Sequence, residues 1–319
     1  MAGFNRRSFL AAAPFIFTAT ALARAAAPAA KTQTPGTYRF RLGDYQLTAL
    51  YDGIWRLPIE DNFIRNAGKA DVNAALAAGF LPPDVLPVSF TALLVNTGRK
   101  LVLIDTGTAG QITDSAGTLT ANLATAGIKP AQIDTILISH FHPDHINGLK
   151  TKDGGKVFAN AEIMVPQVEW DFWMDESRIE TAEGVVKKYF LNARRIFRDL
   201  AREVHRFQPG REIAPGISAI AAPGHTPGHV AFTVSSGNQT MLVIGDAARN
   251  PELFVRHPAW QPSFDMDGPL AVATRQSLLQ KAAADKLLVH GYHFPFPATG
   301  HIAARAEGYE LVPVLWQPL

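Results

Sequence analysis

The stretch Ser139-His140-Phe141-His142-Pro143-Asp144-His145 places three histidines and one aspartate within six residues, in the pattern H-x-H-x-D-H. The preceding residues 133–138, Ile-Asp-Thr-Ile-Leu-Ile, are mostly apolar and branched. Such a run predicts a short buried strand that ends where the histidines begin. The chain has only ten histidines in 319 residues. We therefore favour a metal site over the alternative, a polar loop that contains three histidines by chance.

The spacing inside this motif predicts two adjacent metal positions. Alternation along an extended segment puts His140 and His142 on the same side, where two imidazoles can share one ion. Pro143 then turns the chain, so Asp144 and His145 are directed to a different side. We expect one metal position to use the first two histidines, and the other to use Asp144 and His145.

The composition indicates a globular protein. Hydrophobic residues make up 47% of the chain and charged residues 18%, which excludes a disordered chain. Of the 30 basic residues, three lie in an N-terminal leader without acidic residues, which leaves 27 against 28 acidic side chains. A nearly neutral protein offers no broad basic face for nucleic acid. There are no cysteines, so disulfides and thiolate ligands are excluded and nitrogen and oxygen must hold any metal.

Residues 1–27 have the features of an export signal. Arg6 and Arg7 precede an apolar run from Phe9 to Ala23, which would span about 22 Å as a helix, less than the ~30 Å hydrocarbon core of a bilayer. Small residues at 23–27 supply cleavage sites, and the segment resembles a twin-arginine leader. We expect a flexible lead-in at 28–37 and a periplasmic or secreted protein with no stable membrane anchor after cleavage. An uncleaved anchor is the alternative.

The remaining residues, 38–319, are interpreted as one α/β domain with two similar strand-rich halves. The dipeptide Asp52-Gly53 is typical of a hairpin turn between two strands. A strand, a helix and a strand precede the histidine motif, and open α/β sheets place their sites at the carboxyl ends of such strands. We expect strands at 45–50, from 54 onward, and at 90–95, 100–104, 133–138, 161–165, 217–222, 230–234, 241–244 and 287–289. We expect helices at 71–78, 119–126, 167–173, 184–204 and 269–284.

A second histidine segment follows the strand expected at 217–222. Prolines and glycines fix the backbone of Pro223-Gly224-His225-Thr226-Pro227-Gly228-His229. His225 comes first after the strand, and we expect it to be the third ligand beside His140 and His142. His229 is expected to support this ligand shell.

The last two ligands are expected further along the chain. Asp246 ends an apolar strand at a glycine, where a buried carboxylate is costly unless it is paired or binds a metal. We therefore expect Asp246 to bridge two metals. His290 and His293 are three residues apart on a segment that turns at Gly291, and the spacing alone leaves both as candidates for the remaining ligand.

A set of five histidines and two aspartates suits two borderline divalent ions, zinc first, with manganese, iron or cobalt as alternatives. Two such ions about 3.5–4 Å apart can hold a bridging hydroxide at neutral pH and polarise a carbonyl or phosphoryl oxygen. The predicted reaction is therefore hydrolysis, without a serine or cysteine nucleophile. The alternative is a structural metal site, which would be closed and would not need seven ligands.

The motif H-x-H-x-D-H, followed by His225 and Asp246, resembles the metallo-β-lactamase superfamily, as does the turn Asp105-Thr106-Gly107. Within it, the chain is most similar to the methyl parathion hydrolase group with its related lactonases and arylesterases. The similar stretches cover nearly the whole mature chain: 31–36, 42–44, 101–107, 143–145, 224–229, Phe296-Pro297, 300–302, 308–309 and 312–314.

This resemblance implies an αββα sandwich with two metals at one edge of the packed sheets. It also implies that His293, which precedes the Phe-Pro segment, is the last ligand rather than His290. Asp144 would bind the second metal with His145 and His293, and would orient the bridging hydroxide or accept its proton. The absence of cysteine departs from those β-lactamases that use a thiolate ligand, which disfavours β-lactam hydrolysis.

Four residues are expected in the substrate pocket from the same resemblance. Trp173 and Phe190 match aromatic residues that line the pocket of the organophosphate hydrolase. Ile112 stands where that enzyme has another phenylalanine, and Arg249 stands where an apolar residue is expected. Loss of one aromatic side chain and gain of a cation favour a substrate with a carbonyl or carboxylate over a phosphotriester.

The sequence thus predicts an exported hydrolase of lactones or aryl esters, with organophosphate triesters as secondary substrates. One alternative makes the phosphotriester the main substrate, and another is a non-catalytic periplasmic metal-binding protein. The resemblance also implies a homodimer, and exposed aromatics among residues 55–90 are candidates for its contact.

Overall fold

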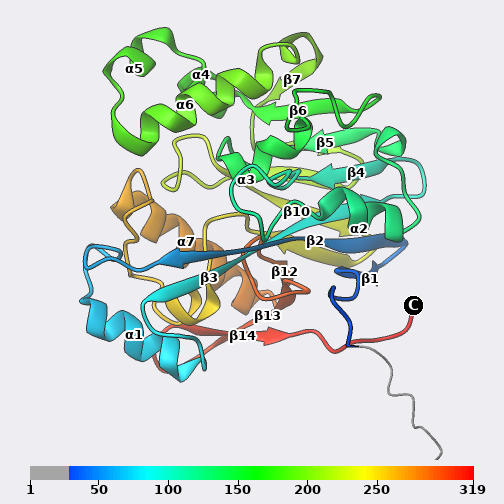
Figure 1. Cartoon of the computed structure of the whole chain (residues 1–319). Coiled ribbons are helices and arrows are strands. Elements are labelled where there is room, and N and C mark those ends of the chain that lie inside the picture. The colour runs from blue at the N-terminus through cyan, green and yellow to red at the C-terminus, as the bar shows by residue number, and fades with distance from the viewer. Residues whose placement is uncertain (1–28) are drawn as a thin grey trace, which may run out of the picture. The chain divides into compact units, whose positions relative to one another are not determined.

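The computed structural model describes residues 29–319, and residues 35–319 form one compact unit. The export signal predicted at residues 1–27 lies outside the described residues. Two seven-stranded sheets make up the centre of the unit (Figure 1). In the part of the chain that the structure describes, no helix is long and apolar enough to cross a bilayer.

The first sheet has the order β1-β2-β3-β4-β5-β6-β7, antiparallel up to β4 and parallel from there on. Its strands are β1 (Thr37–Leu42), β2 (Tyr45–Pro58), β3 (Val85–Asn96), β4 (Leu101–Ile104), β5 (Thr135–Leu137), β6 (Glu162–Pro166) and β7 (Val204–Phe207).

The second sheet has the order β14-β13-β12-β11-β10-β9-β8, and only its β11–β12 pair is parallel. Its strands are β8 (Glu212–Ala214), β9 (Ile217–Ala221), β10 (Val230–Ser236), β11 (Gln239–Val243), β12 (Leu288–His290), β13 (Thr299–Ala304) and β14 (Tyr309–Pro313).

Helices connect and cover the sheets, and α4, α5 and α6 gather at the β6–β7 edge of the first sheet (Figure 1). The α-helices are α1 (Lys69–Ala78), α2 (Leu119–Thr125), α3 (Pro143–Ile146), α4 (Gln167–Trp173), α5 (Glu176–Thr181), α6 (Gly184–Phe197) and α7 (Gly268–Ala284). The 3-10 helices are η1 (Pro130–Gln132), η2 (Asn147–Leu149) and η3 (Ala201–Glu203), and η4 (Pro251–Val255) is a π-helix.

The two sheets pack face to face around an apolar core. Leu47 of β2 and Val102 of β4 are fully buried in one cluster with Phe232 of β10, as expected when the inner faces of two sheets interdigitate. A second cluster joins the sheets to their helices: Leu123 of α2 packs with strands of the first sheet, and Leu279 of α7 with the second. These layers confirm the predicted αββα sandwich.

The prediction of a hairpin turn at Asp52-Gly53 is wrong, because β2 continues through both residues, from Tyr45 to Pro58. The register with β3 shifts between Tyr51 and Gly53, which is the signature of a β-bulge. Gly53 has φ 144°, and a Cβ there would lie 2.2 Å from the Cα of Ala116. The glycine therefore allows a loop to approach the strand closely instead of reversing the chain.

The helix predicted at 184–204 is too long. Helix α6 ends at Phe197, and residues 201–207 form η3 and the strand β7, which pairs in parallel with β6. The strand predicted at 90–95 begins earlier, at Val85, and includes Pro87. Six further α-helices and strands had not been predicted: β1, α3, α5, β8, β13 and β14.

Candidate metal centre

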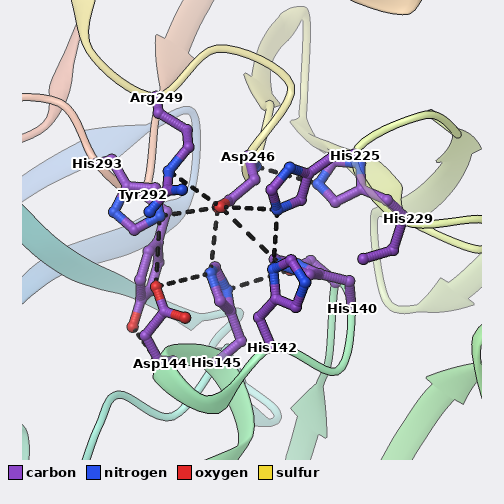
Figure 2. Close-up of polar contacts among 12 residues, drawn as sticks. His140, His142, Asp144, His145, His225, His229, Asp246, Arg249, Tyr292 and His293 are labelled. Atoms are coloured by element: carbon purple, nitrogen blue, oxygen red, sulfur yellow. Dashed lines mark hydrogen bonds and ion pairs between the residues drawn. The ribbon is translucent and has the colours of Figure 1, made fainter. Parts of the chain in front are cut away.

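The histidine motif lies at the carboxyl end of β5, as the pattern predicted. His140 and His142 follow the strand, His142 in extended backbone, and Pro143 begins the one-turn helix α3, which contains Asp144 and His145. Proline is well suited to this first helical position, because no helical hydrogen bond needs its missing N–H. The change from strand to helix separates the four side chains into two directions (Figure 2).

One group of potential ligands consists of His140, His142, His225 and Asp246, all of them buried. Each residue offers one nitrogen or oxygen atom, and these atoms lie within 4.8 Å of one another. His225 comes from the loop between β9 and β10, so its imidazole reaches the motif from the other sheet. Its Nε2 lies 2.9 Å from Nδ1 of His142 and 3.2 Å from Oδ2 of Asp246.

The second group consists of Asp144, His145 and His293. Oδ2 of Asp144 lies 3.5 Å from Nε2 of His145 and 3.4 Å from Nε2 of His293. Tyr292 supports this group, because its hydroxyl donates to the Asp144 carbonyl at 2.6 Å and its ring lies 4.1 Å from that of His145.

Asp246 lies between the two groups, and Figure 2 shows its carboxylate at their centre. Its Oδ2 lies 3.2 Å from His225 of the first group and 3.0 Å from His293 of the second. Its Oδ1 lies 3.1 Å from Nε2 of His145. One carboxylate is therefore within reach of any ion in either group.

The hydrogen bonds of three histidines fit a metal site. Nδ1 of His145 faces Asp105 at 2.8 Å, Nδ1 of His225 faces Asp265 at 2.8 Å, and Nδ1 of His293 faces the Ser89 carbonyl at 2.8 Å. In the neutral imidazole, a proton on each Nδ1 leaves a lone pair on Nε2. All three Nε2 atoms then point at carboxylate oxygens, an arrangement that suits a metal cation between them and that protons on the imidazoles satisfy in its absence.

Buried polar atoms without hydrogen-bond partners also indicate a metal site. Nε2 of His140, Nε2 of His145 and Oδ1 of Asp246 are buried without a hydrogen-bond partner. A buried polar atom without a partner costs stability unless something else satisfies it. Nitrogen and carboxylate donors in this combination suit zinc and similar divalent ions.

Electrostatics hold several ligands in the protonation state that binds cations. Burial, together with the neighbouring His145, lowers the pKa of His140 well below its ordinary value. Burial and His225 lower the pKa of His142 in the same way. Although burial opposes ionisation of Asp144 and Asp246, the surrounding histidines lower the pKa of both carboxyls. His140 and His142 are therefore neutral and the carboxylates ionised near neutral pH, whereas Asp246 and Asp105, against the effect of burial, raise the pKa of His145.

His290 and His229 lie outside both groups. Nε2 of His290 faces the Thr91 carbonyl at 3.1 Å, and burial lowers its pKa to about 4. His229 donates from Nδ1 to the Ala222 carbonyl at 2.9 Å and accepts the backbone N–H of Asp246 at 3.0 Å. His229 therefore holds the backbone of Asp246, a supporting contact of the kind expected for it.

A cavity of about 460 Å³ opens beside the centre, and His142 and Asp144 form part of its wall. Most of the other lining side chains are apolar, which suits a substrate with an apolar body. The remaining lining residues are Trp55, Leu57, Pro58, Glu60, Asn62, Phe63, Phe90, Ile112, Pro143, Val185, Tyr189, Arg249, Ser263 and Phe264.

Of the four predicted pocket residues, Ile112 and Arg249 line this cavity, whereas Trp173 and Phe190 do not. Trp173 and Phe190 are buried in the core, with ring centroids 4.7 Å apart. Placing these two in the cavity wall was therefore a mistake. Tyr189 takes that place, with its ring 4.7 Å from that of His142.

Tyr189 was missed because the prediction chose Phe190, the next residue on α6, for this place in the cavity wall. Val185 also lines the cavity, and residues four apart lie on the same helix face. Tyr189 therefore lies on the same face of α6 as Val185, whereas Phe190 points into the core. Other lining aromatics, such as Trp55 and Phe264, come from distant segments and carried no signal in the sequence.

Arg249 is the cation in the cavity wall beside the metal groups. Its Nε lies 3.5 Å from Oδ2 of Asp246 and has no hydrogen-bond partner. Its guanidinium lies 4.3 Å from the ring centre of Phe264, a cation–π contact that holds the side chain in place. Its remaining donors are available to an oxygen in the cavity.

Comparison with known proteins gives a consistent result. The family model for the metallo-beta-lactamase superfamily matches residues 87–293. A metallo-beta-lactamase domain-containing protein 1 from Xenopus laevis is 27% identical over 208 residues, which cover 64% of this chain and 71% of the relative. An N-acyl homoserine lactonase from a Bacillus species is 23% identical over 244 residues, which cover 70% of this chain and 87% of the relative.

Two solved structures are similar over most of their length. AbOPH, a hydrolase in the beta lactamase superfamily, is 28% identical with a TM-score of 0.84, covering 90% of this chain and 100% of its own. AidC, a dizinc quorum-quenching lactonase in complex with a product, is 28% identical with a TM-score of 0.83, covering 89% and 99%. The dizinc neighbour and the two ligand groups together support a dinuclear metal site.

Proposed function

The chain belongs to the metallo-beta-lactamase superfamily of metal-dependent hydrolases, and from this premise we propose that it cleaves lactones or aryl esters. The observation that carries this proposal is the shared carboxylate of Asp246 between two ligand groups beside an apolar cavity. The relatives and the neighbour named as lactonases make cyclic esters the first substrates to test. N-Acyl homoserine lactones belong among them, since AidC is described with an acyl homoserine product.

The metal ions would be held by His140, His142, His225 and Asp246 in one group, and by Asp144, His145 and His293 with Asp246 in the other. Two divalent ions, zinc first, with manganese, iron or cobalt as alternatives, would polarise the ester carbonyl and activate water at neutral pH.

Asp144 is the carboxylate that we propose as the catalytic base. It borders the cavity and belongs to the second ligand group, so one oxygen can remain in that group while the other faces substrate. Its lowered pKa keeps it ionised. An ionised carboxylate at this point would orient the attacking water and accept its proton.

The substrate would be held by the apolar wall and by Arg249. Trp55, Phe90 and Phe264 would pack against an acyl chain or aryl group, which excludes water from the ester. Arg249 would donate to the amide or carboxylate oxygen of the substrate. Organophosphate triesters would be secondary substrates, because they have no carbonyl or carboxylate oxygen for the cation.

We also propose that the protein is exported through its N-terminal segment and acts outside the cytoplasm, as a homodimer. The twin arginines and apolar run at residues 6–23 support export. Phe80, at the end of α1, has 98% of its surface exposed, and an aromatic ring in this position is a candidate for the dimer contact.

The test of the proposed activity joins metal content to a substrate ranking. We expect two metals per mature chain and turnover that a chelator abolishes and zinc or manganese restores. Hydrolysis of dihydrocoumarin, N-hexanoyl homoserine lactone and p-nitrophenyl acetate should exceed that of methyl paraoxon in kcat/KM. The opposite ranking would make the phosphotriester the main substrate. Metal uptake without turnover of any ester would favour the non-catalytic metal-binding protein.

A separate prediction concerns Arg249. Arg249→Leu should lower kcat/KM for N-hexanoyl homoserine lactone by roughly 10–100-fold, because a hydrogen bond from a charged donor contributes about 1.5–3 kcal/mol. Methyl paraoxon hydrolysis should fall much less or rise. Arg256→Leu is a matched control, since Arg256 is exposed and pairs with Glu252 away from the cavity. An equal loss on all substrates would contradict a role of Arg249 in substrate choice.

A further inference from the structure

Glu169 places a carboxylate in the dry interior next to the metal centre. It lies in the first turn of α4, directly after β6, and its side chain is fully buried. Among residues 29–319 no lysine, arginine or histidine forms an ion pair with it. A buried carboxylate without a cation is costly unless several donors surround it, so its presence calls for a specific role.

Four hydrogen bonds satisfy this carboxylate, two at each oxygen. Oε1 accepts from the backbone N–H of Phe141 at 3.0 Å and from the indole N–H of Trp173 at 2.7 Å. Oε2 accepts from the hydroxyl of Thr226 and from the backbone N–H of Gly228, each at 2.9 Å. Burial raises the pKa of Glu169, and these four donors oppose that shift.

Three of the four donors belong to the two loops that carry the histidines of the first ligand group, and the fourth, Trp173, lies on α4 with Glu169. Phe141 stands between His140 and His142, at the end of a strand of the first sheet. Thr226 and Gly228 follow His225, in the loop that enters β10 of the second sheet. Glu169 therefore accepts hydrogen bonds from residues that are direct sequence neighbours of these three histidines, and not from the histidines themselves.

Close backbone packing accompanies these hydrogen bonds. A Cβ added to Gly228 would lie 2.2 Å from the backbone nitrogen of Glu169. No side chain fits at that distance, so glycine is required for the second loop to reach α4. The His225 loop and the helix carrying Glu169 are thus held together by both packing and hydrogen bonds.

We propose that Glu169 is a positioning residue for the metal group of His140, His142 and His225, and that it fixes the distance between the two loops. This inference rests on the proposed metal centre but not on the substrate. The second group has other direct partners, because Asp105 faces His145 and the Ser89 carbonyl faces His293. Asp105 reaches the first group only through Ser139, whose hydroxyl faces Nδ1 of His140. Loss of the Glu169 carboxylate should therefore affect the two metals unequally.

Glu169→Gln tests this with almost no change of volume. An amide has one acceptor oxygen, whereas all four partners of Glu169 are donors, and three of these are N–H groups that cannot accept. The hydroxyl of Thr226 can turn and accept from the new NH₂ group, so the amide nitrogen should face Thr226 and repel the Gly228 N–H. We therefore expect the loop that carries His225 to lose the hydrogen bond from Gly228 to residue 169, while the loop that carries His140 and His142 keeps its own.

The measurement is metal retention during titration with a chelator, followed by mass spectrometry of the native protein. In Glu169→Gln one metal should be lost at roughly 10–100-fold lower chelator concentration than in the wild type, the usual effect of losing an outer partner of a ligand. The second metal should be retained as in the wild type. Cadmium-113 NMR identifies the affected site, because the first group offers three imidazoles and the second offers two.

Two further variants make the test specific. Thr226→Val removes one of the four donors and should shift the same metal in the same direction by a smaller factor. Tyr292→Phe, which removes the hydroxyl that donates to the carbonyl of Asp144, should weaken the other site. Equal weakening of both metals in Glu169→Gln, or no weakening of either, would overturn the proposal. Because the readout is metal binding, the role of Glu169 can be tested even if the protein hydrolyses none of these esters.

Discussion

Replacing Asp246 with alanine should remove both metals and nearly all hydrolytic activity. Its carboxylate lies 3.0 Å from His293 of one ligand group and 3.2 Å from His225 of the other. Loss of an outer partner of a ligand already costs roughly 10–100-fold in metal affinity or activity, so loss of a ligand shared by two ions should exceed about 100-fold. Metal content by mass spectrometry and kcat/KM on dihydrocoumarin measure the two effects.

Two companion variants make this result interpretable. Asp246→Asn keeps the volume and one oxygen, so it should bind metal more weakly than the wild type but better than Asp246→Ala. Asp285→Ala changes a carboxylate in an exposed pair with Lys281 and should leave both readings unchanged. Two bound metals and full turnover in Asp246→Ala would show that the carboxylate does not bridge the groups.

His293→Ala should lose one metal and at least about 100-fold in kcat/KM, whereas His290→Ala should retain both metals. Nε2 of His293 faces Asp246 and Asp144 at 3.0 and 3.4 Å. The ring nitrogens of His290 face the Thr91 carbonyl and the Thr299 hydroxyl instead. His290→Ala should therefore reduce the free energy of unfolding, by about 1–3 kcal/mol for its buried polar partners, while turnover changes only a few-fold.

Metal content, kcat/KM and thermal unfolding of both variants separate these roles. The wild-type protein treated with chelator supplies the reference for loss of metal without a change of sequence. If His290→Ala lost the metal and His293→Ala kept it, the two histidines would exchange roles. That ranking would also contradict the arrangement in which Asp144, His145 and His293 form one group.

Local patterns were sufficient to predict the elements that carry the site. The apolar run before the histidine motif became β5, and Gln167–Trp173 became α4 with the predicted ends. The hairpin predicted at Asp52-Gly53 did not form because the same dipeptide is compatible with a hairpin turn and with a β-bulge. Which of the two forms depends on the loop at Ala116, a contact distant in the sequence.

The sequence could place the ligands because each follows a strand, and strand ends meet at one edge of a sheet. Residues that reach the site only through tertiary packing were beyond such reasoning. Glu169 lies between Val168 and Trp170 on a short helix with no sign of burial in its pattern, and its four donors come from three segments. Trp55 and Phe264 likewise reach the cavity only through the tertiary fold.

The ligands come from both sheets: the motif follows β5 of the first, whereas His225, Asp246 and His293 follow strands of the second. An unfolded chain keeps only the four residues of the motif close together, so the complete ligand set exists only in the native state, which would bind the metals more tightly. By mass action, an ion at 100 times its dissociation constant adds about 2.7 kcal/mol to the free energy of unfolding. Ions bound at this site would thus be thermodynamic cross-links between the two layers, and the durability of this fold would depend on the metal supply of its surroundings.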